Sequence, residues 1–95
     1  MNTELLRPIT NKEVDTYHHD GVLLLKNMFD KNWIELLNKG IDTNIKSPTR
    51  GSRIWYKDTS GRSMFYDHTA WQNIDEYKKF IFNSPTAKIC GRLMC

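Results

Sequence analysis

The most continuous apolar stretch in the chain is the four-residue VLLL segment, residues 22–25, which lies between a glycine and a lysine. An apolar run of this length is too short to span a membrane and is typical of a strand that is buried on both faces. Helices predicted before and after it would have to pack against such a strand. We therefore predict a strand over residues 22–26, with the fold built outward from it.

A helix is predicted immediately before this strand. Thr10 and Glu13 have the spacing of a capping box, in which each side chain satisfies the other residue's backbone N–H. Gly21 can adopt the left-handed conformation that ends a helix. The pattern therefore predicts a helix over about residues 11–19.

A second helix is predicted over residues 31–45, with Asp30 as its N-cap. Its apolar residues recur at helical spacing within one half-cylinder, and they are Trp33, Ile34, Leu37, Ile41 and Ile45. This arrangement indicates an amphipathic helix with one face committed to a core. Gly40 interrupts the helix and indicates a point of close packing.

The second half of the chain predicts a hairpin followed by two helices. Residues 52–57 and 62–66 are rich in β-forming side chains, and the DTSG sequence between them is typical of a turn. A third helix is expected over residues 74–82, opened by Asn73 or Asp75. Ser84, followed by a proline, is expected to cap a fourth helix.

Together these helices and strands predict an α+β fold that residues 1–95 do not complete. Four amphipathic helices stand against about three short strands, and so few strands cannot cover that much apolar helix surface. We therefore expect residues 1–95 to be the N-terminal part of a single larger domain, with the remaining strands lying beyond residue 95.

Composition and charge exclude several classes of function. The formal net charge is +3, and the lysines are scattered along the chain without a dense basic block, so nucleic-acid binding is not expected. No apolar stretch approaches the length needed to cross a bilayer, and the N-terminus lacks the features of a signal peptide. Cys90 and Cys95 have the spacing of neither a disulfide nor a metal knuckle, which favours reduced thiols and a cytoplasmic protein.

The histidines are the first candidates for chemistry. His18 and Asp20 form a literal H-x-D pair, which two-histidine, one-carboxylate iron sites use together with a distant histidine. The alternative is that His18 and His19 favour a helix C-terminus because of the helix dipole, while Asp20 precedes the glycine stop. His68 has no carboxylate two residues later, so a surface or hydrogen-bonded histidine is the simpler interpretation. No catalytic, cofactor-binding or metal-binding residue is assigned from these patterns.

The densest cluster of arginine and aromatic residues lies in and after the predicted hairpin. In a finished fold these side chains could line a pocket, with arginine holding a carboxylate and the rings enclosing an organic substrate. The alternative is that the aromatic residues are core residues and cross-strand pairs. The candidate pocket residues are Arg53, Tyr56, Met64, Phe65 and Trp71.

Four segments, in order, resemble the phytanoyl-CoA dioxygenase family. Residues 18–29, HHDGVLLLKNMF, are similar to the family's opening F-H-x-D-G-Y-L-V-L-K-N-V-F, and residues 33–37 continue the match. Residues 61–67, GRSMFYD, followed by Trp71, form the third segment. Residues 80–94 resemble the family's F-V-F-N-S-P-A-A-x-I-A-x-x-L-M. The resemblance covers nearly the whole chain.

The resemblance implies a double-stranded β-helix enzyme, with a jelly-roll or cupin-like fold, that uses Fe(II), 2-oxoglutarate and O₂ to hydroxylate a small organic substrate. It also implies that the metal motif, the distal histidine and the arginine for 2-oxoglutarate lie on later strands. The H-x-D pair at residues 18–20 matches the family's helix end instead, so this chain lacks the metal triad. We expect the chain by itself to bind neither cofactor and not to be catalytically competent. The alternative from another class is a small, non-catalytic helical protein-interaction module.

Overall fold

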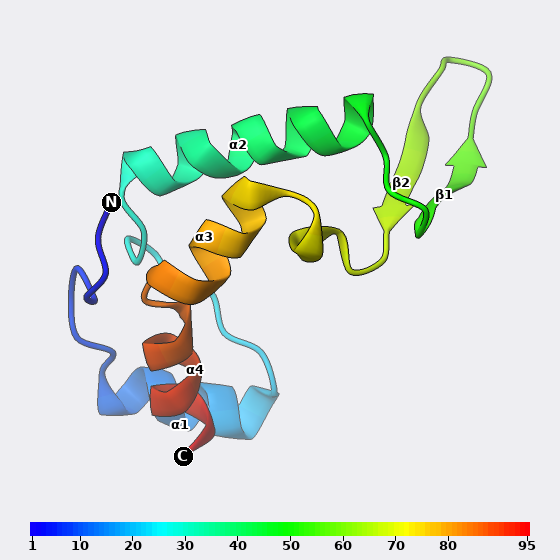
Figure 1. Cartoon of the computed structure of the whole chain (residues 1–95). Coiled ribbons are helices and arrows are strands. Elements are labelled where there is room, and N and C mark those ends of the chain that lie inside the picture. The colour runs from blue at the N-terminus through cyan, green and yellow to red at the C-terminus, as the bar shows by residue number, and fades with distance from the viewer.

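The computed structural model describes the backbone of residues 1–95 and all side chains except those of residues 55–57. Across this described backbone, four α-helices and one antiparallel pair of strands are formed, which confirms the α+β class. The elements in order are α1 (Asn11–Asp20), α2 (Lys31–Lys46), β1 (Ser52–Lys57), β2 (Ser63–Asp67), a 3-10 turn η1 (Ala70–Gln72), α3 (Asp75–Asn83) and α4 (Thr86–Met94) (Figure 1).

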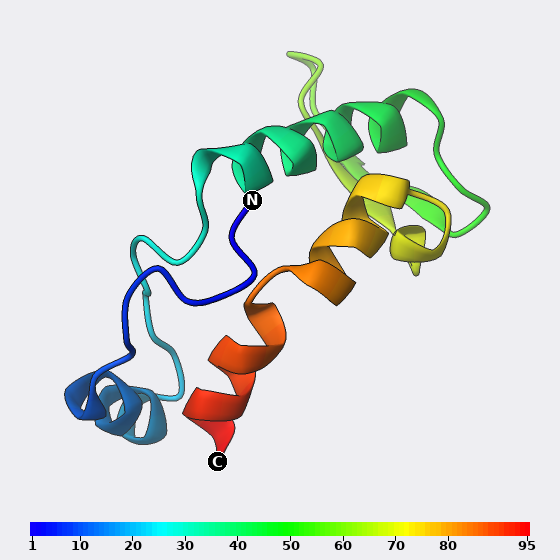
Figure 2. The ribbon, with the colours of Figure 1, turned by 60° about the vertical axis from the view of Figure 1, so that its left-hand side comes forward.

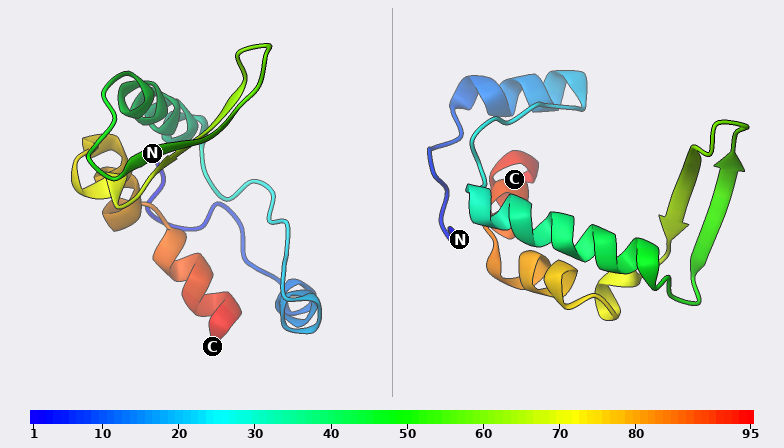
Figure 3. Two further views of the ribbon diagram at one scale, coloured as in Figure 1. Left: turned by 90° about the vertical axis from the view of Figure 1, so that its right-hand side faces the viewer. Right: turned by 90° about the horizontal axis from the view of Figure 1, so that it is seen from above.

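The elements form an extended arrangement around the α2–α3 pair. Helix α2 lies along α3, and α4 leads away from α3 to pack beside α1 (Figure 2). The hairpin of β1 and β2 lies at the opposite end of the molecule from α1, beyond the C-terminal end of α2 (Figure 3). The principal extents of the molecule are 45 × 28 × 21 Å.

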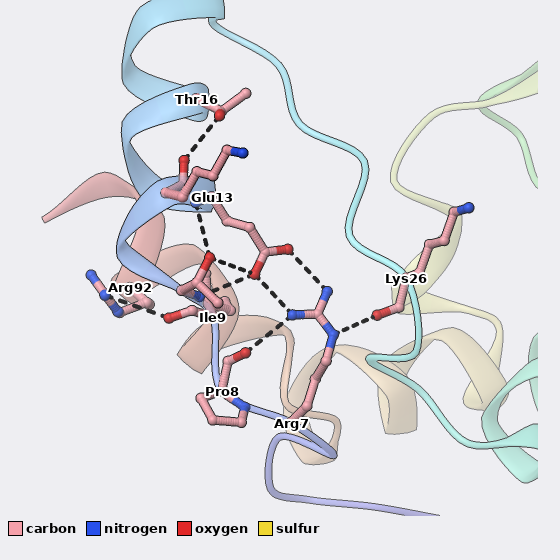
Figure 4. A network of polar contacts seen from close by, with 9 residues as sticks. Arg7, Pro8, Ile9, Glu13, Thr16, Lys26 and Arg92 are labelled. Atoms are coloured by element: carbon pink, nitrogen blue, oxygen red, sulfur yellow. Dashed lines mark hydrogen bonds and ion pairs between the residues drawn. The ribbon is translucent and has the colours of Figure 1, made fainter.

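Helix α1 begins with the predicted capping box. The Thr10 hydroxyl accepts a hydrogen bond from the Glu13 N–H, and the Glu13 carboxylate accepts one from the Thr10 N–H. Arg7 reaches the same carboxylate through two nitrogens, at 2.9 and 3.0 Å (Figure 4). The hydrogen bonds from Arg7 and then from the Thr10 backbone lower the pKa of Glu13 to about 2. Gly21 ends the helix with a φ of 77°, as predicted.

The N-terminal residues fix the start of α2. Asp30 caps the helix by accepting from the Trp33 N–H at 3.2 Å, which confirms the predicted N-cap. The Asn2 side chain donates to the Met28 carbonyl and accepts from the Asp30 N–H. The Trp33 indole donates to the Asn2 carbonyl at 2.7 Å, so this large side chain is buried with its polar group satisfied.

Gly40 allows α2 and α3 to approach closely, as the sequence indicated. A Cβ atom at this position would lie 2.9 Å from Glu76 Cβ and 3.0 Å from the Tyr77 ring. Such distances are far shorter than ordinary contacts between carbon atoms, which lie at about 3.5–4.0 Å. The missing side chain is therefore what permits this packing.

The predicted strand over residues 22–26 is wrong for this structure. No helix, strand or strand pairing is formed over these residues in the described chain. Val22 is 72% exposed and Leu24 is 78% exposed, whereas burial on both faces was expected. A strand requires hydrogen bonds to a neighbouring backbone, and none of the described residues forms them with this segment.

The ends of the later elements differ slightly from prediction. Helix α3 begins at Asp75 with Ile74 at the cap position and no side-chain cap, so neither Asn73 nor Asp75 caps it. Helix α4 begins at Thr86, yet the Ser84 hydroxyl accepts from the Thr86 N–H at 3.3 Å, as an N-cap side chain would.

The core is small for the length of the chain. Among the side chains that the structure describes, its buried apolar residues include Ile9, Met28, Trp33, Ala70, Ile74, Pro85 and Ile89. The radius of gyration is 16.1 Å, against about 12 Å for a compact domain of this length. The accessible surface is 7242 Å², against about 5,700 Å² for a folded monomer of this mass. The fold is therefore open, with much apolar surface uncovered.

The predicted apolar face of α2 is only partly a core face. Trp33 is buried against the Phe80 ring of α3, with the two ring centroids 5.6 Å apart. Ile34, Ile41 and Ile45, at positions i, i+7 and i+11, remain 49%, 44% and 54% exposed. We call these three residues the isoleucine stripe. It runs along one side of the helix, and the fold leaves it largely open to solvent.

Candidate functional site

The hairpin presents most of the candidate pocket residues predicted from the sequence. Its antiparallel register places Arg53 opposite Tyr66 and Ile54 opposite Phe65, with an irregularity between Ile54 and Tyr56. The turn is closed by Asp58, whose carboxylate accepts from the backbone N–H of residues 60 and 62. These hydrogen bonds, led by the Ser60 hydroxyl, outweigh partial burial and lower the pKa of Asp58.

A network of hydrogen bonds connects the hairpin to the helices. The Asp67 carboxylate, at the end of β2, accepts from the Asn44 amide at 2.7 Å and from the Thr49 N–H at 2.9 Å. The Thr49 hydroxyl donates to the other carboxylate oxygen. Partial burial would raise the pKa of Asp67, but the hydrogen bonds from Thr49 and Asn44 outweigh it and lower the pKa.

Asn44 connects this network to α3. It is 4% exposed, and its carbonyl oxygen accepts from the Tyr77 hydroxyl at 3.3 Å. Burial, together with the carboxylates of Asp67 and Glu76, raises the pKa of Tyr77. One buried amide therefore links α2, β2 and α3.

An open hollow of about 510 Å³ lies beside this network. It is lined by the loop after α2 and by the residues that follow β2, namely Pro48, Thr49, Arg50, Gly51, His68, Thr69 and Asn73. Gly51 is required here because a Cβ atom would lie 2.7 Å from the His68 carbonyl oxygen. The His68 Nδ1 lies 2.8 Å from the Tyr66 hydroxyl, so one side of the imidazole is already engaged.

The four candidate pocket residues whose side chains the structure describes do not line this hollow. Arg53 is exposed and donates to the carbonyl of its neighbour Ser52. Met64 is 62% exposed, and Phe65 is half-buried in the hairpin. Trp71 packs edge-on against Phe82 of α3, with the ring centroids 6.0 Å apart.

The side chain of the fifth candidate, Tyr56, lies outside the described residues. The four described candidates do not gather around one cavity in the chain alone. A role in lining a pocket therefore remains a prediction that depends on what covers the hairpin.

The three histidines are separated by their partners. His18 donates from Nε2 to the Leu93 carbonyl at 2.6 Å, which joins the end of α1 to the end of α4. His19 instead contacts its neighbour Asp20 at 2.6 Å. Among the described residues, no three His, Cys, Asp or Glu side chains are placed to share a metal ion. The donors of this chain therefore do not fit a two-histidine, one-carboxylate iron site.

Sequence reasoning missed the Asn44–Asp67 pair. One feature could have revealed it: Asn44 lies eleven residues after Trp33, and therefore on the same side of α2 as a residue expected in the core. A polar residue on a buried face requires a hydrogen-bond partner. That partner lies far along the chain and could not be named from spacing alone.

Comparison with known proteins adds no relatives to this picture. No family model, curated protein or solved structure matches this chain. Within the described residues, no helix combines the length and the apolar character required to cross a membrane.

Proposed function

We propose that this chain is the N-terminal portion of an Fe(II)/2-oxoglutarate-dependent dioxygenase of the phytanoyl-CoA dioxygenase type. Its helices cover part of a double-stranded β-helix, and its hairpin borders the pocket for a small organic substrate. The chain contributes structure and pocket lining, and the reaction itself requires iron ligands from outside residues 1–95.

The observation that carries this proposal is the uncovered apolar surface. Val22 and Leu24 face solvent in the VLLL segment, and the isoleucine stripe faces solvent along α2. Monomeric soluble proteins rarely expose large contiguous apolar patches, and such patches mark surfaces that bind another structure. Helices that pack against a sheet have one apolar side. That side stays exposed to solvent when the sheet comes from a separate segment.

The order of the four similar segments supports the choice of family. The four segments, which include residues 18–29, 61–67 and 80–94, follow one another along the chain in the family's order. The donor set of this chain does not fit iron, so no catalytic step is derived for its residues. Arg53, Met64, Phe65 and Trp71 are proposed as pocket lining, and Tyr56 with them from the sequence alone.

A non-catalytic helical interaction module is the second candidate. The observation that favours it is the isoleucine stripe itself, since an apolar stripe at positions i, i+7 and i+11 also suits a partner helix. The two proposals differ in what covers the chain, which is a β-sheet in the first and a helix or groove in the second.

Two measurements test the proposed function. The chain supplied with Fe(II) and 2-oxoglutarate is expected to release no succinate above a control without protein, and release above that control would contradict the proposal. The chain is also expected to bind a hydrophobic dye and to unfold without a sharp transition, because its apolar surface is open. A sharp, cooperative transition would favour a self-contained module, and an absence of dye binding would contradict both candidates, because both rest on exposed apolar surface.

A further inference from the structure

The VLLL segment runs as an unpaired coil between α1 and α2 (Figure 1). In the part of the chain that the structure describes, no hydrogen bond reaches a backbone N–H or C=O of residues 22–25. The neighbouring Lys26 carbonyl is engaged, since it accepts from Arg7 Nε at 3.0 Å. Extended backbone with free donors and acceptors is a template for pairing with another strand.

The side chains of the segment alternate as they do in a strand. Leu25 packs against the core cluster of Ile9, Met28 and Ile89, and Leu23 is also half-buried. Val22 and Leu24 point the other way and are 72% and 78% exposed. Successive side chains of a strand point to opposite faces. The side chains on one face of the segment therefore pack against the core, and those on the other face are exposed to solvent.

We propose that the VLLL segment is an edge for β-strand addition, and that its occupant is an apolar strand at the margin of a folded β-sheet. This inference rests on the proposed function and names the contact through which the covering layer meets its sheet. The added strand satisfies the free backbone groups, and the second layer of the same β-structure covers Val22 and Leu24.

The Arg7 contact indicates which edge is open. In an extended chain, the backbone groups of alternate residues point to opposite edges. The Lys26 carbonyl points to Arg7, so residues of the same parity, Val22 and Leu24, share that edge. Leu23 and Leu25 present their N–H and C=O groups to the opposite edge, and this is the edge that accepts the strand.

A second copy of the chain is a poor occupant. Two VLLL segments paired with each other would be joined over only about 13 Å of strand, and an isolated two-stranded pairing is marginal in water. A stable interface buries about 1,200–2,000 Å² in total, far more than such a pair provides. A strand that belongs to a folded sheet brings the additional contacts with it.

A tethered strand tests the proposal. The end of α4 lies beside the end of α1, because His18 contacts the Leu93 carbonyl at 2.6 Å. A strand of alternating valine and threonine, joined after Cys95 by about eight glycine and serine residues, can therefore reach the segment, since such a linker spans roughly 16 Å. The matched control carries the same tether with proline at the central valine, which cannot complete a strand ladder.

Amide hydrogen exchange is the readout. We expect the tethered strand to slow exchange at the Leu23 and Leu25 amides about tenfold or more relative to the proline control, which corresponds to at least about 1.4 kcal/mol of protection. Val22 and Leu24 are expected to change less. Equal exchange in the two fusions, or protection confined to Val22 and Leu24, would overturn the proposal.

Two further outcomes are separated by the same measurement. Protection of the unmodified chain that rises with protein concentration would assign the edge to a second copy and overturn the proposed occupant. The exchange measurement requires neither iron nor 2-oxoglutarate. If it overturns the proposed strand addition, the oxygenase proposal is still tested separately by the succinate measurement.

Discussion

Asn44 of α2 donates a 2.7 Å hydrogen bond to the carboxylate of Asp67, 23 residues later at the end of β2. The same amide accepts from the Tyr77 hydroxyl of α3. This buried side chain, together with Thr49, therefore holds the hairpin in its position relative to the helices. In the proposed enzyme, this contact would also set how the hairpin faces the substrate pocket.

Replacing Asn44 with alanine is expected to loosen the hairpin. Asn44→Ala removes both hydrogen bonds from a 4% exposed site, at a cost of roughly 2–4 kcal/mol because one of them is to a carboxylate. Amide exchange at Thr49 and along β1 and β2 should become faster. Asn38→Ala is the matched control, because Asn38 is exposed on the same helix and the gain in helix propensity is the same. Equal exchange in the two variants would show that the hairpin is held by other contacts.

The Arg7–Glu13 contact is expected to make α1 sensitive to acid. The pKa of Glu13 is lowered from 4.5 to about 2 in the folded chain, chiefly by the hydrogen bonds from Arg7. A depressed folded pKa adds stability that is fully present above the unfolded value and is lost as the pH falls through the folded value. The helicity of α1 should therefore decline between about pH 4.5 and pH 2.

The Glu13→Gln variant tests the charge of Glu13 separately from its role in the capping box of α1. Glutamine can still accept a hydrogen bond from the Thr10 N–H through its side-chain oxygen, but it does not titrate. The variant should keep α1 at neutral pH and lose the decline attributed to Glu13. An unchanged acid profile in Glu13→Gln, followed by NMR shifts of the α1 amides, would assign the transition to another carboxylate.

Two glycine-to-alanine substitutions should act in opposite directions. In a helix interior alanine is favoured over glycine by about 1 kcal/mol. A Cβ atom added at Gly91 of α4 would meet no atom within 4 Å beyond its chain neighbours and the backbone of its own helix, so Gly91→Ala should stabilise the chain. At Gly40 the added methyl would lie 2.9 Å from Glu76 Cβ. Overpacking of this kind costs about 1–3 kcal/mol, so Gly40→Ala should destabilise the α2–α3 pair. Amide hydrogen exchange in α4 for Gly91→Ala, and in α2 and α3 for Gly40→Ala, checks the sign.

Local chemistry explains which parts of the fold were predictable. The capping box of Thr10 and Glu13 and the left-handed Gly21 depend on residues close in sequence, and the structure confirms helix α1 between them. The hairpin was predictable because its turn sequence closes on itself through Asp58. Such features need no knowledge of distant segments.

Features that depend on distant partners were not predictable. The VLLL segment has the composition of a buried strand, but composition does not say whether a neighbouring strand is present. Helical periodicity placed Trp33 and Ile41 on the same apolar side of α2, yet the fold buries only Trp33. Spacing defines the face of a helix, whereas the extent of burial depends on how many other elements cover that face.

The isoleucine stripe offers the most direct test of the open surface. Replacing Ile34, Ile41 and Ile45 together with glutamine removes apolar surface that is about half exposed and keeps good helix formers. The triple variant should bind less hydrophobic dye than the original chain while its helical ellipticity is retained. Gln is suited to this comparison because it adds no charge that could repel the dye by itself.

The single variant Trp33→Ala is the contrasting control, since removing a buried tryptophan costs about 3–5 kcal/mol and should increase dye binding. If the triple variant instead loses helicity, the isoleucine stripe is buried in solution. That result would contradict the proposal that this surface binds a β-sheet.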